Sequence, residues 1–212
     1  MKEIQIRKND AGQRLDRFVG KAVPLLPESL LQKYIRLKRI KRNGKGAKRD
    51  VRLVEGDVLQ LYINDEFFER PTEENAWLKI ATPRLDIVYE DENILLADKK
   101  PGVLCHSAGE WSWDTLISNI QAYLRQSGEW DPKAENAFTP ALCNRIDRNT
   151  GGIVIAAKNA EALRILNDKI RDREIDKAYL CVVCGRPRPA EGRLEGYLFK
   201  DAVKNQVYVT KK

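Results

Sequence analysis

A short charged loop leads into an apolar run at Asn144-Arg145-Ile146-Asp147-Arg148-Asn149-Thr150-Gly151-Gly152, after which Ile153-Val154-Ile155-Ala156-Ala157 has the composition of a strand. The loop places one carboxylate, Asp147, between two guanidinium groups. Two nearby positive charges favour the ionised carboxylate, which suits a nucleophile or a charge stabiliser better than a general acid. Gly151 and Gly152 permit a turn into the strand. The alternative interpretation is a surface ion pair beside a turn, which is a common arrangement that contributes little.

The loop resembles the signature of the RluA-class pseudouridine synthases, which reads His-Arg-Leu-Asp, two variable residues and then Thr-Ser-Gly. The matching positions are Arg145, Asp147, Thr150 and Gly152. Ile146 is a mild change from leucine, and Asn144 and Gly151 replace the histidine and the serine. Because these departures lie beside the aspartate, they bear on its positioning more than on the class of reaction.

The resemblance implies roles for the residues that match the signature. Asp147 is the essential catalytic residue, Arg145 occupies the space that a uridine vacates, and Thr150 belongs to the substrate-binding set. Arg148, at a variable position of the signature, is assigned to the same substrate-binding set as a neighbouring cation. Tyr179 joins the site because Lys177-Ala178-Tyr179 resembles the family's Lys-x-Tyr strand, in which the tyrosine stacks on the target base and could act as a base. For Tyr179 the alternative is an ordinary strand aromatic within an expected strand over residues 175–180.

Basic charge is concentrated at the start of the chain. Residues 1–64 contain 16 Lys and Arg against 7 Asp and Glu, whereas residues 65–212 contain 22 against 24. This asymmetry indicates a polyanion-binding appendage on a near-neutral body, with nucleic acid as the first candidate. A solvated charged face is the alternative, but such crowded cations repel one another unless phosphates neutralise them. The cations expected to bind RNA are Arg14, Lys33, Arg36, Lys38, Arg39, Lys41, Arg42, Lys45, Lys48 and Arg49.

Residues 1–64 have the pattern of a small domain of helices and strands. Apolar residues at helical spacing predict a helix over residues 13–22 and a second helix after Pro27. A turn is expected at Asn43-Gly44, and short strands are expected over residues 51–54 and 58–63. The order of these elements resembles the alpha-L RNA-binding domain shared by a small-subunit ribosomal protein and bacterial tyrosyl-tRNA synthetases, which many RluA-class enzymes carry at the amino terminus.

The rest of the chain is expected to form a linker, residues 65–82, and a catalytic domain, residues 83–212. Strands are predicted over residues 85–89, 94–98 and 153–157, and helices over residues 115–124 and after the capping residue Asn159. The expected fold class is therefore α+β, in which a small RNA-binding domain precedes a mixed, mainly antiparallel sheet flanked by helices.

Three further features of this part are interpreted as structural. His106 follows the turn at residues 99–102, and the RluA-class chemistry does not call on it. The aromatic residues Trp111 and Trp113 approach the helix at residues 115–124 and are interpreted as core packing. Cys181 and Cys184 have the spacing of a redox motif, but they lie in a strand-like run over residues 178–185, where residues three apart face opposite sides.

A later family segment, Gly-Arg-Thr-His-Gln-Ile-Arg, is not found in this sequence. Its basic residue normally pairs with the catalytic aspartate in the family, and Arg145 or Arg148 could substitute for it electrostatically. We therefore expect the catalytic domain to be incomplete, as in a fragment of a longer enzyme or in a shortened relative, and we favour the fragment.

Composition narrows the remaining function classes. Four cysteines and one histidine are too few to indicate a metal site or a disulfide framework. No apolar stretch approaches the roughly 20 residues of a membrane span, and the polar start lacks the apolar core of a signal peptide. We therefore expect a cytoplasmic protein with no membrane partner. By family resemblance it is a monomer, and it needs no cofactor because the reaction is redox-neutral.

The leading hypothesis is an RNA pseudouridine synthase that acts on structured RNA, with ribosomal RNA favoured and transfer RNA as a second substrate. A carboxylate suits this isomerisation because it can attack an electron-poor carbon, stabilise it or take a proton. One alternative is an RNA-binding protein without catalysis, which includes an inactive fragment of such an enzyme. Another is a carboxylate hydrolase, which fits poorly because no second acid lies near Asp147 in a recognisable motif.

Overall fold

The structure is a computed structural model that describes residues 1–68, 76–107, 113–201, 204 and 206–210. The chain divides into two compact units, residues 1–175 and residues 176–212. The first unit holds two separate hydrophobic cores, one built mainly from residues 6–63 and one from residues 95–156. The domain boundaries expected after residue 64 and after residue 82 stay predictions.

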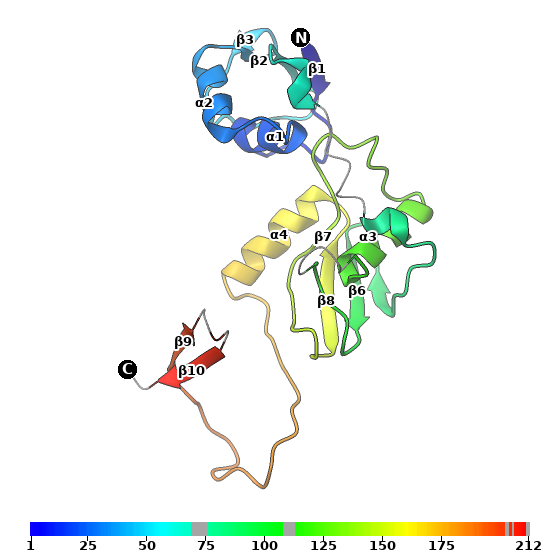
Figure 1. The fold of residues 1–212 in the computed structure, drawn as a ribbon, viewed down its shortest axis with the longest axis vertical. Coiled ribbons are helices and arrows are strands. Elements are labelled where there is room, and N and C mark those ends of the chain that lie inside the picture. Colours follow the sequence, from blue (N-terminus) through cyan, green and yellow to red (C-terminus); the bar gives the residue numbers. More distant parts are fainter. Residues whose placement is uncertain (69–75, 108–112, 202–203, 205, 211–212) are drawn as a thin grey trace. The chain divides into compact units, whose positions relative to one another are not determined.

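The first core lies in an N-terminal module, residues 2–63, drawn blue to cyan in Figure 1. The predicted helices are α1 (Leu15–Ala22) and α2 (Glu28–Arg36), and both bury one apolar face. A four-stranded antiparallel sheet of order β1-β4-β2-β3 accompanies them. Its strands are β1 (Lys2–Gln5), β2 (Ile40–Arg42), β3 (Lys45–Gly46) and β4 (Val58–Leu61).

The turn predicted at Asn43-Gly44 joins β2 to β3. Both residues have positive φ, 50° and 80°, which is the backbone that a tight two-residue hairpin requires. Asp57, the residue just before β4, holds this hairpin, because its buried carboxylate accepts a hydrogen bond from the side chain of Asn43 at 2.9 Å and pairs with Arg42 at 2.6 Å. Although burial alone would raise the pKa of Asp57, hydrogen bonds from Val54, Arg42 and Asn43 lower it.

The strand expected over residues 51–54 is wrong. This segment makes only an isolated bridge, in which Arg52 faces Arg14. Its backbone instead bonds to the loop before α1, since Leu53 N–H donates to Gln13 and Leu53 O accepts from Gly12. The alternating apolar residues of the segment bury Leu53. The partner of the segment is a loop, however, and a loop cannot continue the hydrogen-bond ladder of a sheet.

The predicted linker contains two short 3-10 helices, η1 (Asp65–Phe68) and η2 (Ala76–Lys79). Phe67 and Phe68 pack against the first core, and Trp77 packs against the second, where its ring meets Trp130 edge to face. Residues 69–75 of the predicted linker lie outside the described residues.

The second core packs against a four-stranded sheet of order β5-β6-β8-β7, in which every pair is antiparallel. Its strands are β5 (Ile87–Glu90), β6 (Ile94–Lys99), β7 (Ala141–Leu142) and β8 (Gly152–Ala157). The helices are α3 (Leu116–Gln126) and α4 (Ala160–Arg171). Thr115 caps the first, and the predicted cap Asn159 accepts a hydrogen bond from Ala162 N–H at 2.9 Å. The α+β fold class is confirmed.

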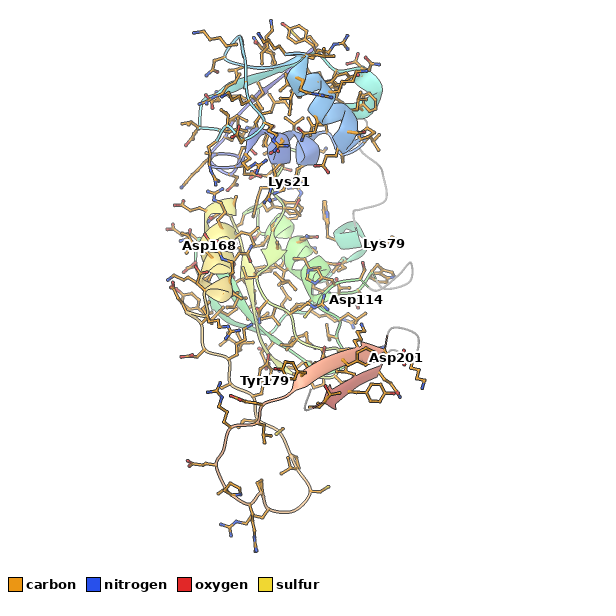
Figure 2. The ribbon with its side chains drawn as sticks, turned by 90° about the vertical axis from the view of Figure 1, so that its left-hand side faces the viewer. Lys21, Lys79, Asp114, Asp168, Tyr179 and Asp201 are labelled. Atoms are coloured by element: carbon orange, nitrogen blue, oxygen red, sulfur yellow. The ribbon has the colours of Figure 1, made fainter. Side chains whose placement is uncertain are left out.

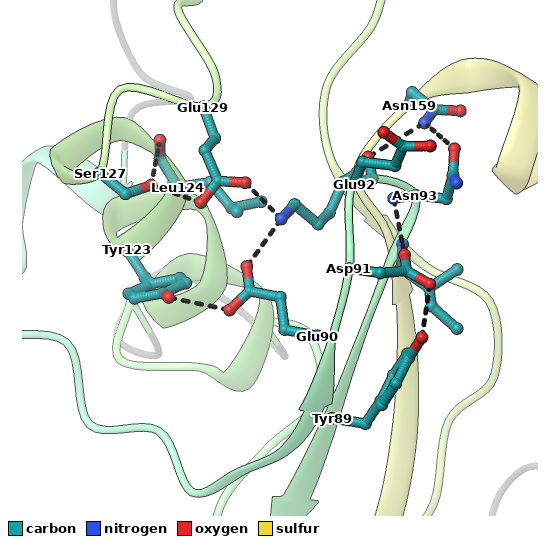
Figure 3. Close-up of polar contacts among 12 residues, drawn as sticks. Tyr89, Glu90, Asp91, Glu92, Asn93, Tyr123, Leu124, Ser127, Glu129 and Asn159 are labelled. Carbon is teal, nitrogen blue, oxygen red and sulfur yellow. Dashed lines mark hydrogen bonds and ion pairs between the residues drawn. The ribbon is translucent and has the colours of Figure 1, made fainter.

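A polar cluster ties the end of β5 to the C-terminal end of α3 (Figure 3). The buried ammonium of Lys158 pairs with Glu90 at 2.7 Å and with Glu129, and Tyr123 donates to Glu90 at 2.8 Å. The hydrogen bond from Lys158 lowers the pKa of Glu129. Burial alone would lower the pKa of Lys158, but its hydrogen bonds with Glu129 and Glu90 raise it.

Acid is therefore expected to remove the contribution of Glu129 to stability. Its folded-state pKa lies below the ordinary value of 4.5, so the contribution is complete above that pH and is lost as the pH falls through the lowered value. Melting temperatures of the wild type and Glu129→Gln should differ most near neutral pH and converge below about pH 4. The control is Glu92→Gln, at an exposed position. A difference that stays constant down to pH 3 would contradict the assignment.

The second unit contains an antiparallel hairpin of β9 (Tyr197–Asp201) and β10 (Gln206–Thr210). The strand expected over residues 175–180 and the strand-like run over residues 178–185 are both wrong, because these residues have no regular secondary structure and are almost all exposed. A strand needs a hydrogen-bonded neighbour, and the described part of the chain offers this segment none.

None of the described helices is long and apolar enough to cross a membrane.

Candidate active site

The loop at residues 143–151 connects β7 to β8 and begins in close contact with β8. Cys143 N–H donates to Ile155 O at 2.7 Å, and the side-chain oxygen of Asn144 accepts from Ile155 N–H at 2.8 Å. The amide of Asn144 also donates to Ile153 O at 3.4 Å. Asn144, which departs from the family signature, thus holds the start of the loop on the strand.

The carboxylate of Asp147 is exposed on this loop, and within the described chain it has no ion pair or side-chain hydrogen bond. The expected bracket of two guanidinium groups is therefore not formed. Arg148 turns away and its Nε donates to Gly102 O at 3.0 Å, while Arg145 is exposed. Arg145 and Asp147 lie only two residues apart, yet they form no ion pair in the described structure, and the Arg148 guanidinium is used by the turn at residues 100–103. The backbone turn closes when Thr150 N–H donates to Asp147 O at 3.1 Å.

Backbone contacts fix the residues on both sides of Asp147. Before it, the carbonyl of Ile146 accepts from the thiol of the buried Cys105 at 3.4 Å. After it, the carbonyl of Arg148 accepts from Gly102 N–H at 2.8 Å and from the ammonium of Lys99 at 3.0 Å. The loop thus presents a free carboxylate from a backbone that is held at both neighbouring peptides.

Lys99 is the residue that sequence reasoning missed. It is only 1% exposed, and its ammonium donates to the carbonyls of Lys100, Val103 and Arg148 at 3.1, 2.8 and 3.0 Å. One buried cation therefore joins the turn at residues 100–103 to the loop. The signal was present in the sequence, because Leu95, Ala97 and Lys99 alternate along β6 and all three face inward.

The two glycines of the loop have different reasons to be glycine. A Cβ at Gly151 would lie 3.2 Å from the ring of Pro101, which is tighter than most such contacts, so a side chain there would require the turn to move slightly. Gly152 has a φ of 132°, a conformation that other residues rarely adopt. The turn itself lies at residues 148–149, and Gly152 is already the first residue of β8, so the turn expected at the two glycines falls earlier on the loop.

His106 lies at the margin of the site. Partial burial and the charge of Arg145 both lower the pKa of His106, so its imidazole is neutral at physiological pH. The residue is exposed and carries no hydrogen bond that would fix a core position in the described structure. Its structural role stays a prediction.

Tyr179 belongs to the second unit, where its side chain is 63% exposed (Figure 2). The structure brings Arg145, Asp147, Arg148 and Thr150 together on one loop, and the role of Tyr179 in the site stays a prediction.

The basic residues of the N-terminal module fall into two groups. Arg14 and Arg42 are engaged internally, the first with Asp16 at 2.6 Å and the second with Asp57 at 2.6 Å. The others have no carboxylate partner among the described residues, and they come from α2, the link to β2, the β2–β3 hairpin and the segment after it. Those free cations are Lys33, Arg36, Lys38, Arg39, Lys41, Lys45, Lys48 and Arg49.

Comparison with known proteins identifies the family. Residues 93–212 match the model of a family described as RNA pseudouridylate synthase. An uncharacterized RNA pseudouridine synthase of Mycoplasma capricolum is 33% identical over 181 residues, which cover 84% of this chain and 58% of the relative. Another from Mycoplasma genitalium is 31% identical over 183 residues, which cover 85% of this chain and 55% of the relative. The ribosomal large subunit pseudouridine synthase C of Escherichia coli is 28% identical over 187 residues, or 88% of this chain and 55% of the relative.

The match to the family model covers more than half of the chain, so the chain belongs to the RNA pseudouridylate synthase family. The RluA-class resemblance of the sequence is thereby confirmed. The chain spans a little more than half the length of the relatives described above.

Proposed function

We propose that this chain carries out pseudouridine formation in ribosomal RNA with Asp147 as the catalytic carboxylate. The observation that supports this most is the loop geometry, in which both peptides beside Asp147 are held and the carboxylate itself is left free for a substrate. A nucleophile must be positioned without being neutralised by a permanent partner, and this loop meets both conditions.

The reaction moves a glycosidic bond within one nucleotide. The bond from N1 of uracil to the ribose breaks, the base turns, and C5 bonds to the same carbon; C5 loses its proton and N1 gains one. Asp147 would attack an electron-poor carbon, stabilise it or take the C5 proton. Thr150 N–H stabilises the turn that presents Asp147.

The uridine must leave its stack before it can reach Asp147. Arg145 lies two residues before Asp147 on the same loop, is exposed and has no carboxylate partner within the described chain, so it is available to fill the vacated space. Arg148 acts differently from Arg145, because its guanidinium is bound to Gly102 O and its main role is to hold the loop. Tyr179 is proposed to stack on the turned base, as the family resemblance implies.

The N-terminal module is proposed to supply affinity through RNA phosphates. Eight of its ten predicted RNA-binding cations have no carboxylate partner in the described structure, and two aromatic rings lie under cations, with Lys41 5.1 Å from the centre of Tyr62 and Arg39 5.3 Å from that of Tyr34. A module that binds only phosphates does not choose a sequence, so the choice of uridine would come from RNA shape.

Removal of module charges is expected to weaken RNA binding and flatten its salt dependence. Lys41, Lys45 and Lys48 are the residues to change to Gln, because Arg42 is needed by the buried Asp57. Each lost phosphate contact should reduce the slope of log affinity against log salt by about 1. The matched control changes Lys133, Lys169 and Lys200 to Gln, which removes the same charge from exposed positions outside the module. Equal slopes for the two triple variants would refute the module's role.

Mapping of pseudouridine in ribosomal and transfer RNA tests the activity in cells. Cells that produce the wild type should show one or more modified uridines that are absent in cells producing only Asp147→Ala. If all sites persist with the variant, the chain is an RNA-binding protein without catalysis. The free cations of the module are the specific observation that favours this second function.

A further inference from the structure

A hollow of about 360 Å³ lies on the first unit, and its lining contains no residue of the proposed catalytic loop. It is lined by residues of the segment 79–84 and by Trp113, Asp114 and Asn119 at the start of α3. Figure 2 labels Lys79 and Asp114, which border it. This volume is at the low end of the roughly 300–1,000 Å³ found for small-molecule pockets, which suits a single base and excludes a duplex.

The hydrogen bonds of Asn119 fix the shape of the hollow. Its side chain is 4% exposed and has a partner for each polar atom: the amide donates to Asp114 Oδ1 at 2.7 Å and to Thr115 O at 2.9 Å, and the oxygen accepts from Arg84 N–H at 2.8 Å. These bonds join the segment carrying Arg84 to the helix start carrying Asp114. The two walls are therefore held at a fixed separation.

The walls present three kinds of group to solvent. Trp113 is 43% exposed, so the interpretation of this tryptophan as core packing is wrong; Trp111 lies outside the described residues. Lys79 and Arg84 are exposed cations without a carboxylate partner in the described part of the chain. Asp114 uses one carboxylate oxygen for Asn119 and keeps the other available.

We infer that this hollow binds one unstacked nucleotide of single-stranded RNA. The base stacks on Trp113, the adjoining phosphates lie against Lys79 and Arg84, and the free oxygen of Asp114 accepts a hydrogen bond from a base N–H. Exposed aromatics combined with cations are the general means by which proteins hold single strands. A ligand without negative charge would leave Lys79 and Arg84 unused, and an anion without a ring would leave Trp113 unused.

The hollow is connected to the catalytic loop through the start of α3. Leu116 N–H donates to Leu104 O at 2.8 Å, Ile117 N–H donates to Cys105 O at 3.2 Å, and the thiol of Cys105 donates to Ile146 O. A nucleotide held here would anchor the same RNA strand that delivers a uridine to Asp147. The inference rests on the proposed function only in taking RNA as the ligand.

The test measures binding of a fluorescent single-stranded RNA pentamer to the full chain in which Lys41, Lys45 and Lys48 are changed to Gln, so that the module contributes little. In this background, Trp113→Ala should weaken binding about fivefold or more, and Trp113→Phe should restore most of it because a stacking face is retained. The double variant Lys79→Gln, Arg84→Gln should also weaken binding and reduce the salt slope by about 1.4, which is about 0.7 for each phosphate contact with a single strand. The control double variant Lys133→Gln, Lys169→Gln should leave both the affinity and the salt slope unchanged.

Ultraviolet crosslinking of the same pentamer then locates the contact, which should fall on the peptide that contains Trp113. The inference would be overturned if both Trp113→Ala and the double variant of Lys79 and Arg84 bound the pentamer with unchanged affinity while keeping wild-type melting temperatures. It would also be overturned if the pentamer crosslinked only to peptides that do not contain Trp113. Asp147→Asn should bind the pentamer normally. Loss of the proposed activity and loss of this subsite are therefore separate results.

Discussion

Pseudouridine formation by Asp147→Asn is expected to be at least about 10³-fold slower than by the wild type, as is usual when a nucleophile or its equivalent is removed. The substitution keeps the size of the side chain and removes its charge. Because the carboxylate has no internal partner in the described structure, its loss leaves no buried group unsatisfied. The melting temperature and the affinity for RNA should therefore stay close to those of the wild type.

Single-turnover conversion of a saturating RNA substrate measures this effect separately from binding. The matched control is Asp168→Asn, which removes an exposed carboxylate on α4 whose only side-chain partner among the described residues is the similarly exposed Arg171. The control should react at the wild-type rate. A rate for Asp147→Asn within tenfold of the wild type would remove Asp147 from the chemistry.

Lys99→Met is expected to lower the free energy of unfolding by about 3 kcal/mol, because three hydrogen bonds from one buried charged donor are lost and the carbonyls of Lys100, Val103 and Arg148 are left without it. Methionine has a similar length and fills the space, so the effect reports on the ammonium and not on a cavity. The carbonyl of Arg148 keeps its bond from Gly102 N–H. The loop should therefore form but hold Asp147 less firmly, with a lower rate constant for conversion.

Lys100→Met provides the neighbouring control for Lys99. Its side chain is 60% exposed and its ion pairs are with Asp86 and Asp98, at 2.8 and 2.7 Å. Exposed pairs contribute about 0–1 kcal/mol, so denaturation in urea should separate the two variants clearly. An equal loss of stability in Lys99→Met and Lys100→Met would show that the hydrogen bonds of Lys99 do not stabilise the loop.

The elements that the sequence predicted well are those whose signals are local. The helix after Asn159 begins where its cap indicates, and the turn at Asn43-Gly44 follows from two residues that tolerate positive φ. The strand at residues 153–157 needed only its apolar run and the glycine before it. In each case the residues that specify the element lie within it.

The predictions that failed depended on a partner elsewhere in the chain. Residues 51–54 and 178–185 have strand composition, but the first segment meets a loop and the second meets no strand in the described structure. Composition records how well a segment would fit a sheet and cannot supply the neighbour that completes it.

At the candidate active site, too, the sequence predicted the local feature and missed the contacts with distant residues. The sequence pattern located the loop, but it suggested that two arginines hold Asp147, whereas a buried lysine and a thiol from residues 99 and 105 hold the peptides on either side. Those partners lie more than 40 residues away along the chain. The period-two burial of β6 could have indicated Lys99, and nothing in the sequence pairs Cys105 with the loop.

The central claim is that Asp147, presented by this loop, converts uridine to pseudouridine in RNA. The most direct measurement adds the purified chain to ribosomal RNA transcribed without modifications and quantifies pseudouridine at each uridine by mass spectrometry. The account predicts conversion at one or a few uridines by the wild type and none by Asp147→Asn. Absence of conversion by a folded wild-type chain that binds the RNA, or conversion by the variant at the wild-type rate, would contradict it.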